Sequence, residues 1–147
     1  MKIPIVRLQV VKESEIDYGS EVLDIPLKAA QIVKKIIGET DREYVVVCCV
    51  NSAMKPTNIE IAGIGTSNTC LFGIPEIFKT AMLTNANGII VFHTHPSGEV
   101  NPSKLDKLQT KRLLKVGELL GIEVKDHIIL GEGDKYYSFL ENELLVA

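Results

Sequence analysis

The sequence predicts an α/β fold, a three-layer-like sandwich in which a mixed β-sheet is flanked by helices. Short apolar runs bounded by turn residues alternate along the chain with amphipathic segments of helical length, as strands interleaved with helices do. Apolar residues make up 46% of the chain and charged residues 24%, which is typical of an ordinary globular domain. We expect the 147 residues to form a single domain, with a short N-terminal strand extension over about residues 1–22.

The individual elements follow from apolar runs and from the residues that interrupt them. We expect strands at 3–11, 44–50, 59–63, 88–95, 124–130 and 135–140, and helices at 27–37, 75–84 and 103–120. Gly38 and Gly121 end the first and last helices, since glycine is the common residue just past a helix C-terminus. Pro75 is accepted in the first turn of the second helix. The apolar runs at 44–50 and 88–92 indicate buried strands.

Two histidines at the end of one predicted strand are the most informative residues of the chain. His93 and His95 lie on the same face of the strand, with attachment points about 6.6 Å apart at a rise of about 3.3 Å per residue. Imidazoles at that separation can converge on one ion with Zn–N bonds of roughly 2.0–2.1 Å. Pro96 ends the strand, because proline cannot donate to a β-ladder.

A carboxylate follows within the same short segment. Asp106 lies on the first turn of the helix that begins at Ser103, after a turn-rich loop over residues 97–102. This loop can fold the carboxylate back beside the two histidines. Two histidines and one carboxylate leave the fourth position of a tetrahedral zinc site open, which is the pattern of catalytic zinc.

Each of these residues also has a purely structural interpretation. A histidine at a strand end is often a structural or surface residue. Ser103 followed by Asp106 is a helix-start pattern, in which the serine caps the helix and the acid favours the helix dipole. The two interpretations of Ser103 are compatible, since a capping hydroxyl can also face a site. His127, in a later strand, is interpreted as a structural hydrogen-bonding residue, with a supporting role behind the site as the alternative.

The joint pattern His93-Thr-His-Pro, six residues, Ser103, two residues and Asp106 resembles the JAMM motif of JAB/MPN-type metalloproteases. Segments in the expected order at 63–66, 75–78, 81–87 and 126–129 make the chain similar to the RadC-type branch of that superfamily, from about Leu27 to Leu145. The resemblance implies a JAB/MPN fold, related to that of cytidine deaminases.

Two residues depart from the RadC-type pattern. Thr94 stands where these chains usually carry asparagine, although threonine suits the wider JAMM pattern. Glu76 follows Pro75 in a position where they usually carry arginine, so an arginine-dependent role at that position is not expected. Neither residue is an expected metal ligand.

The resemblance also implies a reaction. One zinc ion per chain, held by His93, His95 and Asp106, would activate a water molecule for attack on the carbonyl of a peptide or isopeptide amide. The hydroxyl of Ser103 would donate a hydrogen bond to the oxyanion.

The family mechanism requires an upstream glutamate that takes and returns a proton. The resemblance places it at Glu43, just before an expected strand. The residue types alone leave Glu39 and Asp41 as further candidates, and each of the three can equally be a solvated surface acid.

Composition sets the cellular context. The chain has three cysteines and no signal-peptide segment at its N-terminus, so we expect a reducing, cytoplasmic location. Cys48 and Cys49 lie in an expected strand and are interpreted as core thiols, whereas Cys70 lies in a polar stretch and is a candidate for exposure. No apolar run approaches the roughly 20 residues of a membrane span, so no membrane partner is expected.

Charge bears on the choice of partner. The net charge of −3, from 16 basic and 19 acidic residues, favours a protein or peptide-like substrate over nucleic acid. The basic residues of the last long helix are interpreted as its solvated face; they are Lys104, Lys107, Lys111, Arg112 and Lys115. The sequence does not indicate an oligomeric state.

Other functions remain as alternatives. A metal-dependent nuclease or DNA-repair-associated protein is one, since histidine and aspartate around a metal also serve phosphate chemistry. A non-catalytic binding module of the MPN type is another. A zinc nucleobase deaminase is excluded, because the chain lacks both the His-x-Glu and the Pro-Cys-x-x-Cys of that class.

Overall fold

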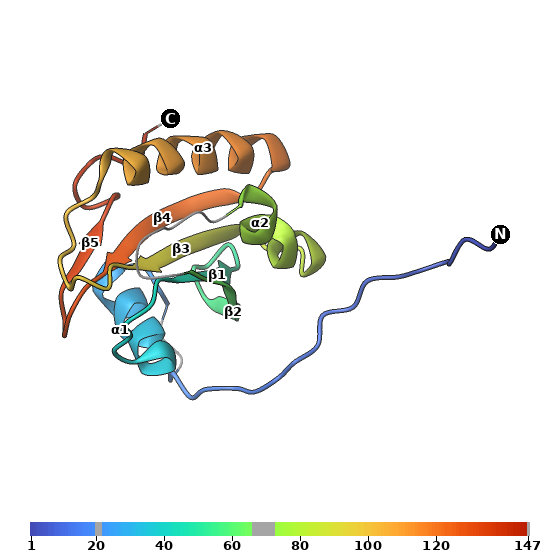
Figure 1. The fold of residues 1–147 in the computed structure, drawn as a ribbon, viewed down its shortest axis with the longest axis horizontal. Coiled ribbons are helices and arrows are strands. Elements are labelled where there is room, and N and C mark those ends of the chain that lie inside the picture. The colour runs from blue at the N-terminus through green and yellow to red at the C-terminus, as the bar shows by residue number, and fades with distance from the viewer. Residues whose placement is uncertain (20–21, 66–72, 147) are drawn as a thin grey trace.

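The computed structural model describes residues 1–19, 22–65 and 73–146. Its helices are α1 (Pro26–Ile37), α2 (Ile74–Leu83) and α3 (Lys104–Leu120), and its strands are β1 (Tyr44–Val50), β2 (Pro56–Ile64), β3 (Gly88–Thr94), β4 (Glu123–Leu130) and β5 (Tyr136–Ser138). The strands form one sheet with α1 on one face and with α2 and α3 on the other (Figure 1). The α/β sandwich predicted from the sequence is confirmed.

The sheet is mixed, with strand order β2-β1-β3-β4-β5. Only β3 and β4 run parallel, and the other neighbouring pairs are antiparallel. In the β1–β3 pairing Val45 lies opposite His93, so the start of β1 lies beside the end of β3. This register brings the residues that precede β1 to the edge of the sheet where the predicted metal ligands lie.

Apolar side chains of the central strands divide between the two faces. Those of β1 that pack toward α1 are Val46, Cys48 and Val50. Those of β1 that pack toward α2 and α3 are Val45, Val47 and Cys49. Burial raises the pKa of Cys48 to about 12 and that of Cys49 to about 11, so both thiols stay protonated and unreactive at neutral pH. Their prediction as core thiols is confirmed; Cys70 lies outside the described residues.

The strand predicted at 3–11 is wrong. Residues 1–18 contain no helix or strand, and the segment runs extended and away from the sheet (Figure 1). Its large apolar side chains are exposed; they are Ile3, Ile5, Val6, Leu8, Val10 and Val11. An alternating apolar pattern predicts a strand-like conformation, but a strand also requires a neighbour, and among the described residues the sheet consists of β1 to β5.

The last strand is shorter than predicted. β5 ends at Ser138 rather than near residue 140, because the backbone N–H of Leu140 donates to the carboxylate of Asp126 at 3.0 Å and the chain turns there. None of the helices in the described ranges has the length and apolar character needed to cross a membrane.

Candidate metal centre

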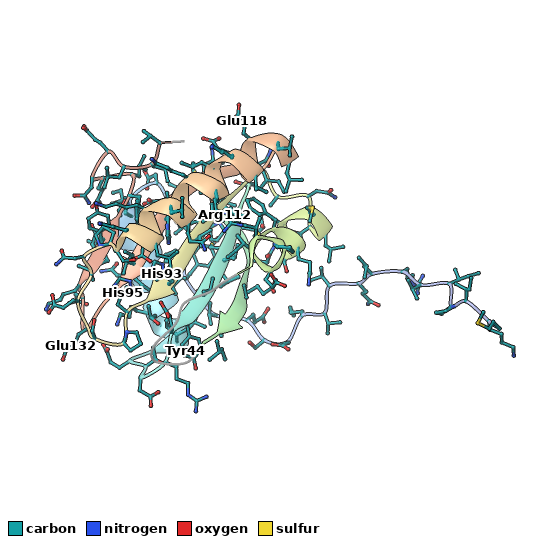
Figure 2. All side chains as sticks on the ribbon, turned by 45° about the horizontal axis from the view of Figure 1, so that its top comes forward. Tyr44, His93, His95, Arg112, Glu118 and Glu132 are labelled. Atoms are coloured by element: carbon teal, nitrogen blue, oxygen red, sulfur yellow. The ribbon has the colours of Figure 1, made fainter. Side chains whose placement is uncertain are left out.

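His93 and His95 lie where β3 ends. His93 is fully buried and is the next-to-last residue of β3. His95 lies just past the strand, and its backbone N–H still donates to the Leu130 carbonyl of β4 at 3.0 Å. Figure 2 shows both histidines at the edge of the sheet beside the first turn of α3. The two side chains therefore point to the same side of the strand, as their spacing predicts.

The start of α3 carries the carboxylate. The Ser103 hydroxyl accepts a hydrogen bond from the Asp106 N–H at 3.0 Å, and the Asp106 carboxylate accepts one from the Ser103 N–H at 2.8 Å. These two bonds form a capping box, so the structural interpretation of this pair is confirmed. They also fix the direction of the Asp106 side chain, whose two oxygens remain able to accept further bonds.

The loop between β3 and α3 is held close to the end of β4. The N–H of Glu132 donates to the Gly98 carbonyl at 3.1 Å. A Cβ atom at Gly131 would lie 2.4 Å from that same carbonyl oxygen and 2.6 Å from a Val100 methyl group, so only glycine permits this approach. The close packing of the loop returns the chain toward the histidines and places Asp106 beside them.

The three predicted ligands converge. His93 Nε2 lies 3.1 Å from Asp106 Oδ1, His95 Nε2 lies 3.2 Å from Asp106 Oδ2, and the two Nε2 atoms are 3.0 Å apart. Around a tetrahedral zinc ion with bonds of roughly 2.0–2.1 Å, neighbouring ligand atoms are about 3.3 Å apart. The donor atoms therefore have close to the mutual spacing that one ion requires.

The hydrogen bond of His95 Nδ1 determines whether its other ring nitrogen, Nε2, carries a proton or a lone pair. His95 Nδ1 is 3.0 Å from the Glu99 carbonyl oxygen, which can only accept, so Nδ1 carries a proton. In the neutral ring Nε2 then carries a lone pair, which points toward His93 and Asp106. A cluster of acceptor atoms at this spacing is stabilised by a cation, and this chemistry fits a metal ion.

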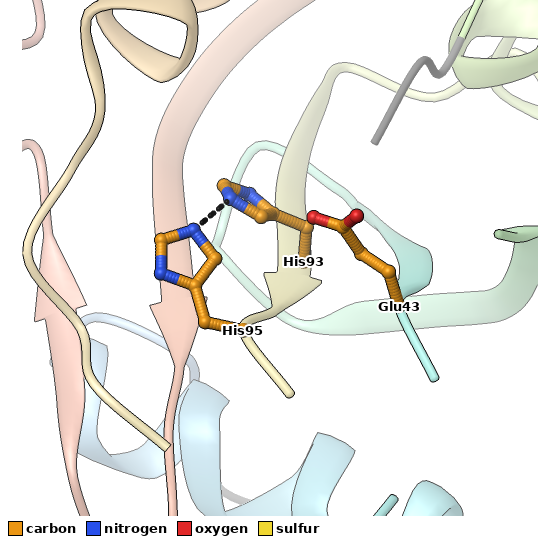
Figure 3. Close-up of side chains that lie close together, drawn as sticks. All are labelled: Glu43, His93 and His95. Atoms are coloured by element: carbon orange, nitrogen blue, oxygen red, sulfur yellow. Dashed lines mark hydrogen bonds between the residues drawn. The ribbon is translucent and has the colours of Figure 1, made fainter. Parts of the chain in front are cut away.

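Glu43, the residue just before β1, completes the cluster. It is 7% exposed, and one ligand atom each from Glu43, His93 and His95 lie within 4.8 Å of one another (Figure 3), so this group of three could also hold a metal ion. The distances from the histidine nitrogens to the Asp106 oxygens, 3.1 and 3.2 Å, are well below this limit of 4.8 Å. They favour Asp106 as the third member of a metal-binding group, with Glu43 beside it.

Thr94 holds the backbone on both sides of Glu43. Its hydroxyl accepts from the N–H of Tyr44 at 2.9 Å and donates to the carbonyl of Arg42 at 3.0 Å. The carbonyl of Glu43 itself accepts from Gly65 N–H at 2.7 Å. The threonine that departs from the usual RadC-type residue therefore has a structural task, which is to fix the approach of Glu43.

The two competing acids lie elsewhere. Glu39 accepts hydrogen bonds from the Lys34 ammonium at 3.2 Å and from Gly133 N–H at 3.0 Å, and these partners lower its pKa. Asp41 is exposed. The structure thus places only Glu43 of the three candidates beside the histidines.

Charge within the cluster is mutually stabilising. Burial alone would raise the pKa of Asp106, but when the His93 and His95 rings carry protons on Nε2, their hydrogen bonds to the carboxylate outweigh burial and hold that pKa well below its usual range. Burial likewise opposes protonation of His95, yet its hydrogen bond to Asp106 and the charge of that carboxylate raise the pKa of His95. An ionised Asp106 therefore favours positive charge on its neighbours, whether a proton or a metal ion supplies it.

His127 lies directly behind His93. Its Nε2 is 2.8 Å from His93 Nδ1, its Nδ1 is 2.6 Å from the Thr110 hydroxyl, and its ring stacks on Phe139 with centroids 4.7 Å apart. Burial lowers the pKa of His127 well below the ordinary value, so the ring is neutral. The prediction that His127 makes structural hydrogen bonds is confirmed, and its contact with His93 also fits the alternative, a supporting role behind the site. Thr110 was not predicted from the sequence, although it lies four residues after Asp106 on the same face of the helix.

Access to the centre is one-sided. The side chain of His93 is 0% exposed and that of His95 is 18% exposed. The predicted solvated face of α3 is confirmed, since its basic residues Lys104, Lys107, Lys111, Arg112 and Lys115 are exposed. Of the two histidines, His95 is therefore the one that solvent reaches.

Comparison with known proteins identifies similar chains. A sequence model of the RadC-like JAB domain matches residues 23–144. A UPF0758 protein of Thermotoga maritima is 36% identical over 127 residues, which cover 86% of this chain and 56% of that protein. A UPF0758 protein of Staphylococcus haemolyticus is 41% identical over 126 residues, or 85% and 55% of the two chains. One of Clostridioides difficile is 51% identical over 82 residues, or 56% and 34%. The chain spans about half the length of the first two relatives.

Proposed function

Since the chain belongs to the RadC-like JAB domain family, we propose that it is a zinc-dependent hydrolase that cleaves a peptide or isopeptide amide. The observation that carries the proposal is the convergence of His93, His95 and Asp106, whose donor atoms lie 3.0 to 3.2 Å apart. Three protein donors leave a fourth tetrahedral position for water or substrate, as in catalytic zinc sites.

A zinc ion bound there would supply positive charge that polarises an amide carbonyl and lowers the pKa of water toward about 7. Glu43 takes one proton from the attacking water and delivers it to the amine as the C–N bond breaks. Two observations support this role: Glu43 is buried beside the histidine ligand atoms, and Thr94 fixes the backbone on both sides of it.

Ser103 is assigned to the oxyanion. Its oxygen accepts the Asp106 N–H, and this bond leaves the hydroxyl proton available for donation. The hydroxyl would donate to the carbonyl oxygen as negative charge develops during attack. The capping bond fixes the position of the hydroxyl without consuming its proton, so capping and catalysis use different parts of the same group.

The proposal extends to the location and the substrate class of the protein. The two buried free thiols Cys48 and Cys49 support the reducing, cytoplasmic location expected from the sequence. A protein or peptide-like substrate is favoured by the net charge of −3. Because the relatives are longer than this chain, the single domain over 1–147 and the activity of the whole protein are also proposals.

Glu43→Gln, with Glu39→Gln as the matched control, tests the proposed reaction. Both variants remove one carboxylate charge from the same short segment, but only Glu43 lies beside the histidines. In an assay of peptide and isopeptide-linked libraries by mass spectrometry, we expect Glu43→Gln to bind zinc and to lose at least roughly a hundredfold in rate, the usual contribution of general acid–base catalysis. Glu39→Gln should act as wild type.

The opposite results separate the alternatives. Full turnover by Glu43→Gln would remove this glutamate from the mechanism. A zinc-loaded wild-type protein that cleaves nucleic acid and no amide would support the metal-dependent nuclease instead. One that binds zinc and cleaves neither substrate would support a binding module.

A further inference from the structure

We propose that Thr110 and His127 select the tautomer of His93, so that its Nε2 presents a lone pair to the metal position. The inference rests on the proposed function only in taking zinc as the ion. Both residues are positioning residues, since neither contacts the place where the ion and substrate would lie. The contacts that carry it run in one line from His93 through His127 to Thr110 and end on the backbone carbonyl of Asp106.

The distances along this line are all those of hydrogen bonds. His93 Nδ1 is 2.8 Å from His127 Nε2, and His127 Nδ1 is 2.6 Å from Thr110 Oγ1. Thr110 Oγ1 is in turn 2.9 Å from the carbonyl oxygen of Asp106, one helical turn earlier. The line thus begins at one predicted ligand and ends on the backbone of another.

The acceptor at the end of the line gives it a direction. A hydroxyl has one proton, and the Asp106 carbonyl can only accept. When Thr110 donates to that carbonyl, its oxygen accepts from His127 Nδ1–H. The neutral His127 ring then has a lone pair at Nε2, which accepts the proton carried by His93 Nδ1. In neutral His93, Nε2 is left without a proton and can bind a metal.

The reversed line would be incompatible with metal binding. If Thr110 donated to His127 Nδ1, then His127 Nε2–H would donate to His93 Nδ1, and the proton of neutral His93 would lie on Nε2. That proton would lie between His95 Nε2, 3.0 Å away, and Asp106 Oδ1, 3.1 Å away, where an ion would have to be. The Asp106 carbonyl opposes this arrangement, because it accepts the threonine proton at 2.9 Å on the other side.

Burial makes the selection effective. His93 and His127 are both 0% exposed, so bulk water has little access to either ring. Phe139 stacks on the His127 ring with an angle of 5° between the rings, and the backbone N–H of His127 donates to the Asp126 carboxylate at 2.7 Å. These contacts hold the His127 ring and backbone in place, and groups that orient a metal-bound histidine in this way typically account for 10- to 100-fold in metal affinity.

The decisive variants change only the hydroxyl. Thr110→Val keeps the branched shape of the side chain but removes both the donor and the acceptor, whereas Thr110→Ser keeps them. Thr84→Val is a matched control, because the Thr84 hydroxyl donates to the carbonyl four residues earlier at 2.8 Å in α2, which packs on the same sheet away from the histidines. Thr84→Val reports how much zinc affinity changes when a threonine-to-carbonyl hydrogen bond is lost away from the metal position.

Zinc affinity measured by competition with a chromophoric chelator is the first measurement. We expect Thr110→Val to bind zinc at least about 10-fold more weakly than wild type, with Thr110→Ser and Thr84→Val close to wild type. Equal affinity of Thr110→Val and wild type would overturn the inference. A wild-type protein that binds no zinc would refute the proposed function, and the tautomer would then be decided by the second measurement alone.

That second measurement needs no variant. Long-range ¹H–¹⁵N correlation spectra of the imidazole nitrogens of uniformly labelled wild-type protein distinguish a protonated from an unprotonated nitrogen. We expect His127 to carry its proton on Nδ1 and none on Nε2, in both metal-free and zinc-loaded protein. A proton on His127 Nε2 would overturn the inference whatever the outcome with zinc.

Discussion

Replacing Thr94 by valine should loosen the segment that carries Glu43. The variant removes an acceptor for Tyr44 N–H at 2.9 Å and a donor to the Arg42 carbonyl at 3.0 Å, while the volume of the side chain is almost unchanged. Thr94 is 4% exposed, so water replaces these bonds poorly. Each hydrogen bond contributes about 0.5–1.5 kcal/mol, so we expect a loss of about 2 kcal/mol in the free energy of unfolding.

Thermal unfolding measures this loss directly. For a domain of this size about 1 kcal/mol corresponds to roughly 2–4 °C, so Tm should fall by roughly 4–8 °C in Thr94→Val. Thr94→Ser keeps both bonds and should stay near wild type. Zinc affinity should change little in either variant, because the ligand atoms of His93 and His95 are not held by this hydroxyl, whereas the rate of amide cleavage should fall in Thr94→Val. A valine variant as stable and as active as the serine variant would refute the role assigned to the clamp.

Two further perturbations test other parts of the structure. Burial raises the pKa of Asp126 to about 6, above the unfolded value of about 3.9, so ionising Asp126 costs the folded state about 3 kcal/mol. Below about pH 4 the carboxyl is protonated in both the folded and the unfolded state, and this cost is absent. The free energy of unfolding therefore falls by about 3 kcal/mol as the pH rises from about 4 to about 6. In Asp126→Asn, urea unfolding at several pH values should show that part of the pH dependence abolished; an unchanged profile would assign it to other groups. Gly131→Ala should push the Gly98 carbonyl away, lower stability by about 1–3 kcal/mol and weaken zinc binding, while Gly63→Ala, where a Cβ meets nothing within 4 Å, should do neither. Calorimetry checks the predicted loss of stability, and chelator competition checks the predicted loss of zinc affinity. Equal behaviour of the two alanine variants would show that the close packing of the loop contributes to neither.

The candidate metal ligands could be predicted from the sequence because the position of each depends on local structure. His93 and His95 share a face through the alternation of a strand, and Asp106 is placed by the first turn of a helix whose cap, Ser103, is visible in the sequence. Strand boundaries in the centre of the sheet were predicted equally well, since the run Tyr44–Val50 is continuously apolar and is buried at all but its first residue.

Residues that reach the site through tertiary pairing were harder to predict. Glu43 approaches His93 because β1 pairs with β3, and without the family resemblance Glu39 and Asp41 were equally good candidates. Thr110 meets His127 only because α3 packs on β4, which no local pattern specifies. The failed strand at 3–11 shows the same limit, since an alternating pattern describes a conformation and does not supply its partner.

Zinc content is the most direct test of the central claim. Wild type, His93→Ala and the distant control Glu39→Gln should be purified without added metal and analysed by inductively coupled plasma mass spectrometry, before and after zinc loading and desalting. The convergence of His93, His95 and Asp106 predicts close to one zinc per chain in wild type and control, and loss of that zinc in His93→Ala. A wild-type protein that retains no zinc after loading, or a His93→Ala protein that retains it fully, would contradict the assignment of this cluster as a metal centre.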